Sequence, residues 1–191
     1  MSKVLLDKEA VRFLDAATSQ VLCIKGKWGV GKTFAWKKIV SIRAGNDPNM
    51  SSYAYVSLFG INSLTALKFS IFEQTVAPSA IEENISKTTF KAQIDRLKGF
   101  GRKLSGYAGG AIGLYSGTDA SDLLSQSTFF MVRDQIVCID DLERKGRDLD
   151  IRDVLGLASF LKEERNCKVV LLLNEEQLEG LDKKDIKKNL E

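Results

Sequence analysis

A glycine-rich octapeptide carries the most specific chemical signal in this sequence. Residues 26–33 read Gly-Lys-Trp-Gly-Val-Gly-Lys-Thr and match the Walker A pattern G-x-x-x-x-G-K-[ST]. Its glycines let the backbone turn and approach phosphate oxygens, because no Cβ stands in the way. Successive backbone amides, together with the N-terminus of a following helix, favour a bound anion. The pattern therefore predicts a phosphate-binding loop, and a plain glycine turn between a strand and a helix is the alternative.

Two polar side chains of this loop have predicted chemical roles. Lys32 supplies a positive charge to the β- and γ-phosphates of a nucleotide, and the Thr33 hydroxyl is a ligand for magnesium. We expect the nucleotide to be bound by the loop and by the residue after it: Gly26, Lys27, Trp28, Gly29, Val30, Gly31, Lys32, Thr33 and Phe34.

A second chemical signal is a pair of carboxylates that follows an apolar segment, residues 135–139. This order is typical of a Walker B motif, in which Asp140 holds the magnesium shell and Asp141 orients or deprotonates the attacking water. Glu143 is the alternative base, since the Asp side chain is one methylene shorter than Glu. Two adjacent Asp residues are also common in a turn that ends a strand. The Walker A motif upstream is what favours the Walker B interpretation over such a turn.

Further polar residues are candidates for the same site. Asn174 follows an apolar segment, and its amide is predicted to lie near the γ-phosphate and to position water; capping of a helix over 175–181 explains it as well. Four arginines are candidates for a residue that reaches the nucleotide of a neighbouring subunit: Arg144, Arg147, Arg152 and Arg165. Arg165 is the best placed of these, although a solvated helix face explains each one.

Composition excludes several classes of enzyme. The 191 residues contain no His, which rules out Ser-His-Asp and Cys-His catalysis and every His-containing metal site. Cys23, Cys138 and Cys167 are far apart, so they predict reduced core residues of a cytoplasmic protein rather than a disulfide framework. The net charge of +3 is too small to indicate a nucleic-acid partner by itself. What remains is the chemistry of phosphate enzymes.

The elements that must position these residues alternate along the chain. Apolar runs predict strands over 21–24, 53–58, 135–139 and 168–173. Helices are predicted over 7–17, with Asp7 as N-cap, over 33–44, from Asn62 or Ser63 to before Pro78, and over 150–165. This alternation predicts an α/β fold whose parallel sheet is covered on both faces.

The stretch from about 79 to 130 interrupts the alternation and is predicted to be an insertion. Basic residues gather between Lys87 and Lys103, together with Phe90 and Phe100, which is a weak signal for nucleic-acid binding; a solvated amphipathic helix is favoured. The apolar run 104–114 is far shorter than the ~20 residues that span a bilayer, so we favour a flexible loop over the alternatives of membrane contact and of a pore, partner or nucleic-acid loop.

Taken together, these motifs resemble the KAP family of P-loop NTPases, within the AAA+/STAND-like group. The matching segments are KGKWGVGKTFAW, YVSLFG, IVCIDDLER and KVVLLLNEEQL. Glu143 departs from the family's D-D-L-D-R pattern. The resemblance implies a three-layer P-loop NTPase sandwich with a sheet in the order 5-1-4-3-2. Chain length argues for one domain over 1–191. Because no fifth strand or lid follows the fourth strand, we expect this chain to be the N-terminal part of a longer protein that supplies them.

The same resemblance implies a function. We expect binding of ATP with Mg²⁺, and hydrolysis that drives or regulates a larger assembly, with a setting in bacterial antiviral defence. The alternative is a nucleotide-dependent oligomerisation switch or scaffold with little or no turnover. A homo-oligomer and a partner protein are the expected associates, and turnover that rises with protein concentration would separate the two hypotheses.

Overall fold

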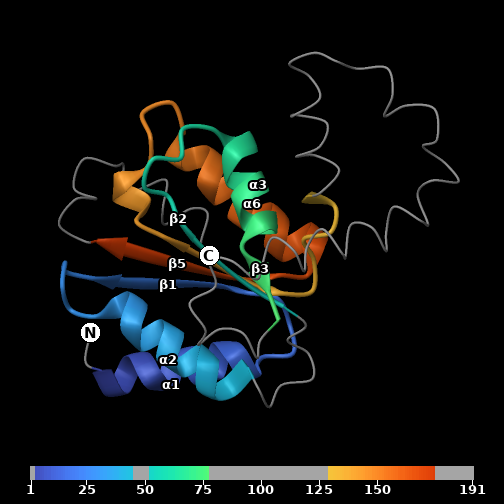
Figure 1. Ribbon diagram of the computed structural model, residues 1–191. Coiled ribbons are helices and arrows are strands. Elements are labelled where there is room, and N and C mark those ends of the chain that lie inside the picture. The colour runs from blue at the N-terminus through green and yellow to red at the C-terminus, as the bar shows by residue number, and fades with distance from the viewer. Residues whose placement is uncertain (1–2, 45–51, 78–128, 175–191) are drawn as a thin grey trace, which may run out of the picture.

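The computed structural model describes residues 3–44, 52–77 and 129–174. Within these ranges the chain forms strands and helices that alternate for most of its length (Figure 1). In chain order they are α1 (Lys3–Asp15), β1 (Val21–Gly26), α2 (Lys32–Ala44), β2 (Tyr53–Ser57), α3 (Leu64–Glu73), β3 (Thr75–Val76), β4 (Ile136–Asp140), the short 3-10 helix η2 (Leu142–Arg144), α6 (Ile151–Arg165) and β5 (Lys168–Asn174).

The sheet has the strand order β1-β5-β4-β2-β3. The first four of these strands pair in parallel, which confirms the predicted α/β class and the predicted order of the four apolar segments. The edge strand β3 was not predicted, because the sequence suggested a helix running on towards Pro78. Instead α3 ends at Glu73, and the β-branched Thr75 and Val76 pair antiparallel with β2.

Helices cover both faces of the sheet, as the continuous apolar strands predict. Figure 1 shows α1 and α2 on one face and α3 and α6 on the other. Side chains of β4 alternate between these layers: Val137 and Ile139 pack in the α3/α6 core, whereas Ile136 and Cys138 pack in the α1/α2 core. The central strands β4 and β5 are therefore buried on both sides.

Several predicted boundaries move in the structure. Helix α1 begins at Lys3, so Asp7 lies inside the helix and the prediction that it is the N-cap was wrong. Ser63 is the N-cap of α3, since its hydroxyl accepts a hydrogen bond from the Ala66 amide at 3.1 Å. Residues 79–128 of the predicted insertion and the predicted helix over 175–181 lie outside the described residues.

The three cysteines are thiols of the core or its margin. Cys138 and Cys167 are fully buried and Cys23 is half-buried. Burial is the main cause that raises the pKa of Cys23 and of Cys167 to about 11, and it raises the pKa of Cys138 well above its ordinary value. These thiols are therefore protonated at neutral pH and suit packing rather than nucleophilic catalysis.

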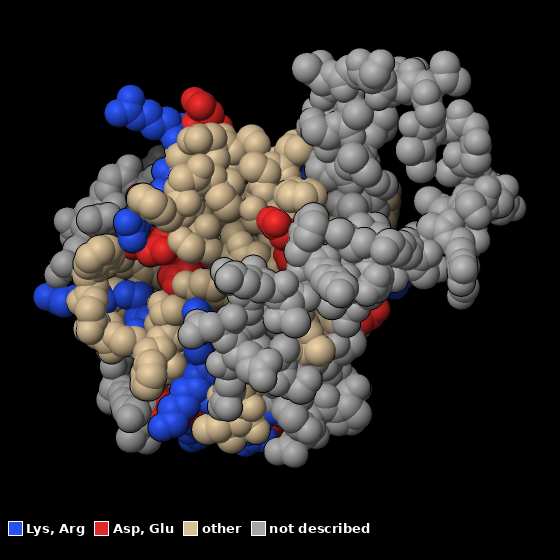
Figure 2. Space-filling view, viewed as in Figure 1, with Lys and Arg blue, Asp and Glu red and all other residues tan. Residues whose placement is uncertain are grey.

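The described helices and surface bear on the predictions about membranes and nucleic acid. Within the described ranges, no helix has the length and apolarity needed to cross a membrane. Figure 2 shows Lys and Arg side chains interspersed with Asp and Glu on the described part of one face. The basic segment 87–103 and the apolar run 104–114 both fall outside the residues described.

Candidate functional site

The glycine-rich loop connects the end of β1 to the start of α2, as predicted. Gly29 and Gly31 have φ angles of +74° and +81°, a left-handed conformation that strains any residue with a Cβ. A Cβ at either position would meet no atom within 4 Å, so conformation rather than crowding requires these glycines. At Gly26 a Cβ would approach Val30 Cγ2 to 3.3 Å, which makes that position tight.

Lys32, the first residue of α2, reaches back over the loop. Its Nζ donates hydrogen bonds to the carbonyl oxygens of Gly26, at 2.7 Å, and Lys27, at 2.9 Å. Helix α2 starts directly behind it, where the Ala35 amide bonds the Gly31 carbonyl at 2.8 Å. The positive charge of Lys32 and the positive end of the helix thus lie at the same loop.

The Asp140 carboxylate joins the loop to the centre of the sheet. Its Oδ2 accepts hydrogen bonds from Thr33 Oγ1 at 2.6 Å and from Tyr55 Oη at 2.8 Å. Its Oδ1 accepts one from the Asp141 amide at 2.8 Å. Asp140 is only 6% exposed, so these donors compensate for its loss of solvation. The two predicted metal ligands, Thr33 and Asp140, are therefore in contact in the fold, although they are 107 positions apart in the sequence.

Tyr55 was not predicted to belong to the site. Burial, chiefly, and the neighbouring Asp140 carboxylate raise the pKa of Tyr55 far above its ordinary range. The phenol therefore stays protonated and acts as a fixed donor to Asp140. The register of β2 against β4 brings it there, since Tyr55 aligns with Cys138 and Ser57 with Asp140, and no local sequence signal shows that register.

Asp141 is held in a strained backbone conformation. Its φ of 57° and ψ of 42° are left-handed, which costs a residue with a side chain about 1–3 kcal/mol. Ser57 Oγ donates to its Oδ2 at 2.6 Å, and the Arg144 guanidinium lies 3.9 Å from its Oδ1. These contacts fix the carboxylate at the carboxyl edge of the sheet. Neither Ser57 nor Tyr55 was predicted to belong to the site, because a single polar residue on a strand matches no motif.

The alternative base, Glu143, lies between the loop and β5. Trp28 Nε1 donates to its Oε1 at 3.4 Å, and the backbone N–H of Asn174 donates to its Oε2 at 3.4 Å. Asn174 is 3% exposed and aligns with Gly26 across the β1–β5 pair. The structure thus gathers Trp28, Glu143 and Asn174 at one place, together with the loop.

The candidate arginines separate into two groups. The Arg144 guanidinium lies at the site, 4.2 Å from the centre of the Phe59 ring and 5.6 Å from that of Trp28. Arg165 ends α6 just before β5 begins, which is the opposite end of the sheet from the loop, and it donates to the Phe130 carbonyl. Arg144 is therefore the arginine at the chain's own site. Arg147 and Arg152 are exposed near the start of α6.

The side chains present fit a magnesium ion bound together with phosphates. In the described part of the chain, no three His, Cys, Asp or Glu residues gather as a metal centre of their own. The hydroxyl and carboxylate of Thr33 and Asp140 are hard oxygen ligands, and Mg²⁺ in phosphate enzymes takes its remaining ligands from phosphate and water. These two residues would hold the ion, which when bound neutralises charge on the phosphates.

Comparison with protein families agrees with this geometry. Residues 3–191 match the family model described as the KAP family P-loop domain. No curated protein matches the chain in a sequence search. The family match spans the loop, the β4 carboxylates and β5, and a P-loop domain of this kind indicates nucleotide binding. The chain belongs to the KAP family of P-loop NTPases.

Proposed function

We propose that this chain binds Mg·ATP and hydrolyses it. The observation that carries the proposal is the 2.6 Å hydrogen bond between Thr33 and Asp140. It joins the phosphate loop to the carboxylates of β4 at the carboxyl end of a parallel sheet, where such sheets bind ligands. A turn with no function would need no bond between two such distant motifs.

The residues of the site divide the work in this proposal. Amides of the loop bind the phosphates, and Lys32 exchanges its two carbonyl partners for phosphate oxygens. A water molecule attacks the γ-phosphorus, its proton passes to a carboxylate, and ADP departs as the leaving group. Asp141 is the first candidate to accept that proton and Glu143 the second, while Asn174 helps to position the water.

A nucleotide-dependent switch with little turnover is the second candidate function. One observation favours it: both candidate bases are engaged by the protein itself. Asp141 is held by Ser57 and Arg144, and Glu143 accepts bonds from Trp28 and from the backbone of β5. In this second proposal a docking subunit rearranges these contacts and frees a carboxylate to accept the proton of water.

The wider role follows from the family rather than from the site. We propose a single domain over residues 1–191 with an insertion at about 79–130, which assembles into a homo-oligomer and acts on a partner protein. Bacterial antiviral defence is the setting that the family resemblance implies. In this proposal, the nucleotide cycle drives or regulates that assembly.

Replacement of Lys32 tests the phosphate loop. Lys32→Ala is expected to abolish the gain in affinity that the γ-phosphate gives ATP over ADP, because it removes the ammonium group that lies over the carbonyls of Gly26 and Lys27. Isothermal titration with a non-hydrolysable ATP analogue measures this. Lys68→Ala is the matched control, since Lys68 lies over the Phe129 ring on the far layer. Unchanged affinity in Lys32→Ala would contradict the site.

Two isosteric variants identify the base. Asp141→Asn is expected to retain ATP binding and to lower turnover by roughly 10²–10⁴-fold, the usual contribution of a positioned base. Glu143→Gln produces that loss only if Glu143 is the base. Steady-state phosphate release measures both, with Glu163→Gln on the exposed side of α6 as control. Normal turnover in both variants would refute the catalytic assignment.

The dependence of turnover on protein concentration separates the two candidate functions. An ATPase completed by a neighbouring subunit is expected to show turnover per subunit that climbs as concentration rises, because an arginine or a displaced carboxylate must come from an encounter. Light scattering on the same samples reports assembly. Assembly with ATP but no turnover above the Lys32→Ala blank favours the switch, and turnover that is constant per subunit argues against oligomeric catalysis.

A further inference from the structure

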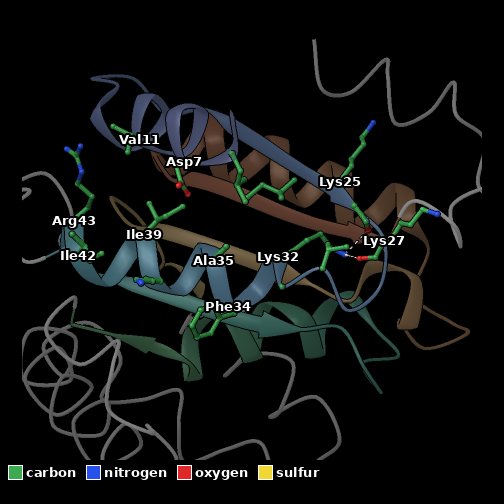
Figure 3. A pocket seen from close by; sticks show the side chains of 16 residues that line it. Asp7, Val11, Lys25, Lys27, Lys32, Phe34, Ala35, Ile39, Ile42 and Arg43 are labelled. Atoms are coloured by element: carbon green, nitrogen blue, oxygen red, sulfur yellow. Dashed lines mark hydrogen bonds between the residues drawn. The ribbon is translucent and has the colours of Figure 1, made fainter. Parts of the chain in front are cut away.

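Two neighbouring residues at the start of α2 contact different parts of the molecule. Lys32 lines a pocket of about 820 Å³ between α1 and α2, and its Nζ bonds the carbonyl oxygens of Gly26 and Lys27 in the loop (Figure 3). Thr33 contacts the sheet instead, where its hydroxyl donates to Asp140 Oδ2 at 2.6 Å. Helix α2 therefore connects the phosphate loop directly to the carboxylate at the end of β4.

Tyr55 connects the same carboxylate to α2 a second time. Its phenol donates to Asp140 Oδ2 at 2.8 Å, and Lys37 Nζ lies 3.8 Å from the centre of its ring. Lys37 follows Thr33 by four residues, so the two share one side of α2. Thr33, Asp140, Tyr55 and Lys37 thus form a closed ring of contacts through α2, β4 and β2.

The hydrogen bonds of Asp140 limit what it can offer to an ion. An ionised carboxylate has about four lone-pair positions, two on each oxygen. On Oδ2, Thr33 and Tyr55 take both positions, and on Oδ1 the Asp141 amide takes one. Among the contacts of the described residues, a single position on Oδ1 remains. Asp140 therefore has one oxygen to give to an ion, or to a water molecule of its shell.

This limit bears differently on the two common divalent cations. Mg²⁺ demands near-ideal octahedral geometry and keeps several waters, so a single oxygen from a carboxylate suits it. Ca²⁺ takes six to eight oxygen ligands in flexible geometry and often both oxygens of one carboxylate. Without the Tyr55 donor, Oδ2 would regain a lone pair and Asp140 would offer both oxygens to one ion. The bond from Tyr55 thus disfavours the ion that gains from a second oxygen.

We propose that Tyr55 is a positioning residue that makes the ion site prefer Mg²⁺ to Ca²⁺, because it occupies the Asp140 oxygen that Ca²⁺ would use. The inference rests on the proposed function and deepens it, since it names the residue that selects the ion accompanying the nucleotide. Tyr55 acts through Asp140 alone. The Lys37 ammonium group over its ring helps to hold the phenol in place.

The test is Tyr55→Phe, which removes the hydroxyl and keeps the ring. Titration calorimetry with a non-hydrolysable ATP analogue, in Mg²⁺ and separately in Ca²⁺, measures the preference. The wild-type chain is expected to bind the analogue at least about tenfold more tightly with Mg²⁺, and Tyr55→Phe to lose most of that ratio, since a hydrogen bond to a charged group is worth about this factor. A purely structural role would weaken binding with both ions alike. An unchanged ratio would overturn the inference.

Tyr53→Phe is the matched control. Tyr53 lies on the same strand and in the same α1/α2 core, but its hydroxyl accepts a hydrogen bond from Trp36 Nε1 at 3.2 Å. This variant is expected to lower the melting temperature and to keep the preference for Mg²⁺. An equal loss of preference in Tyr53→Phe and Tyr55→Phe would overturn the role of the Asp140 contact. In EDTA, Tyr55→Phe is expected to bind the analogue as the wild-type chain does, and a weaker affinity there would also contradict the inference.

The wild-type chain tests the inference without any variant. Equal affinity for the analogue with Mg²⁺ and with Ca²⁺ would overturn the selective role of Tyr55, although the proposed binding of a metal nucleotide would stand. A chain that gains no affinity from either ion would contradict the metal site of the proposed function as well. A chain that binds no analogue under any of these conditions would contradict the whole proposal.

Discussion

The buried carboxylate of Asp140 is the constraint on which the site depends. A charge that is 6% exposed is costly unless hydrogen-bond donors surround it. Those donors come from three places: the hydroxyl of Thr33 on α2, the phenol of Tyr55 on β2 and the amide of Asp141 beyond β4. Satisfying one buried charge therefore fixes the phosphate loop, β2 and the Walker B segment relative to one another.

Strand order explains why the remaining polar groups meet at the same place. Strand β5 lies between β1 and β4, so its last residue, Asn174, lies between the loop that leaves β1 and the carboxylates that follow β4. Glu143 contacts both neighbours, since it accepts hydrogen bonds from Trp28 in the loop and from the backbone N–H of Asn174. If the loop shifted when phosphates bind, its contact with Glu143 through Trp28 would change. In the proposed function, this contact would connect nucleotide binding to a candidate base.

Much of this architecture could be predicted from the sequence, because its signals are local. The loop has fixed residue types at fixed spacing, and each long strand is an unbroken apolar run, so the α/β class follows from the residues, whereas the strand order was implied by the family resemblance. The predictions stop where position depends on tertiary pairing. Tyr55 and Ser57 became part of the site through the register of β2 against β4, and Thr75–Val76 became a strand only because β2 offered an edge. Likewise, no local signal showed that α1 starts at Lys3.

The most direct test of the central claim is a double-mutant cycle between Thr33 and Asp140, read as the gain in ATP affinity that Mg²⁺ provides. Thr33→Val and Asp140→Asn are each expected to remove most of that gain, and the double variant to lose little more, because both residues serve one site. Losses that simply add, or a magnesium effect that survives in either single variant, would contradict the account.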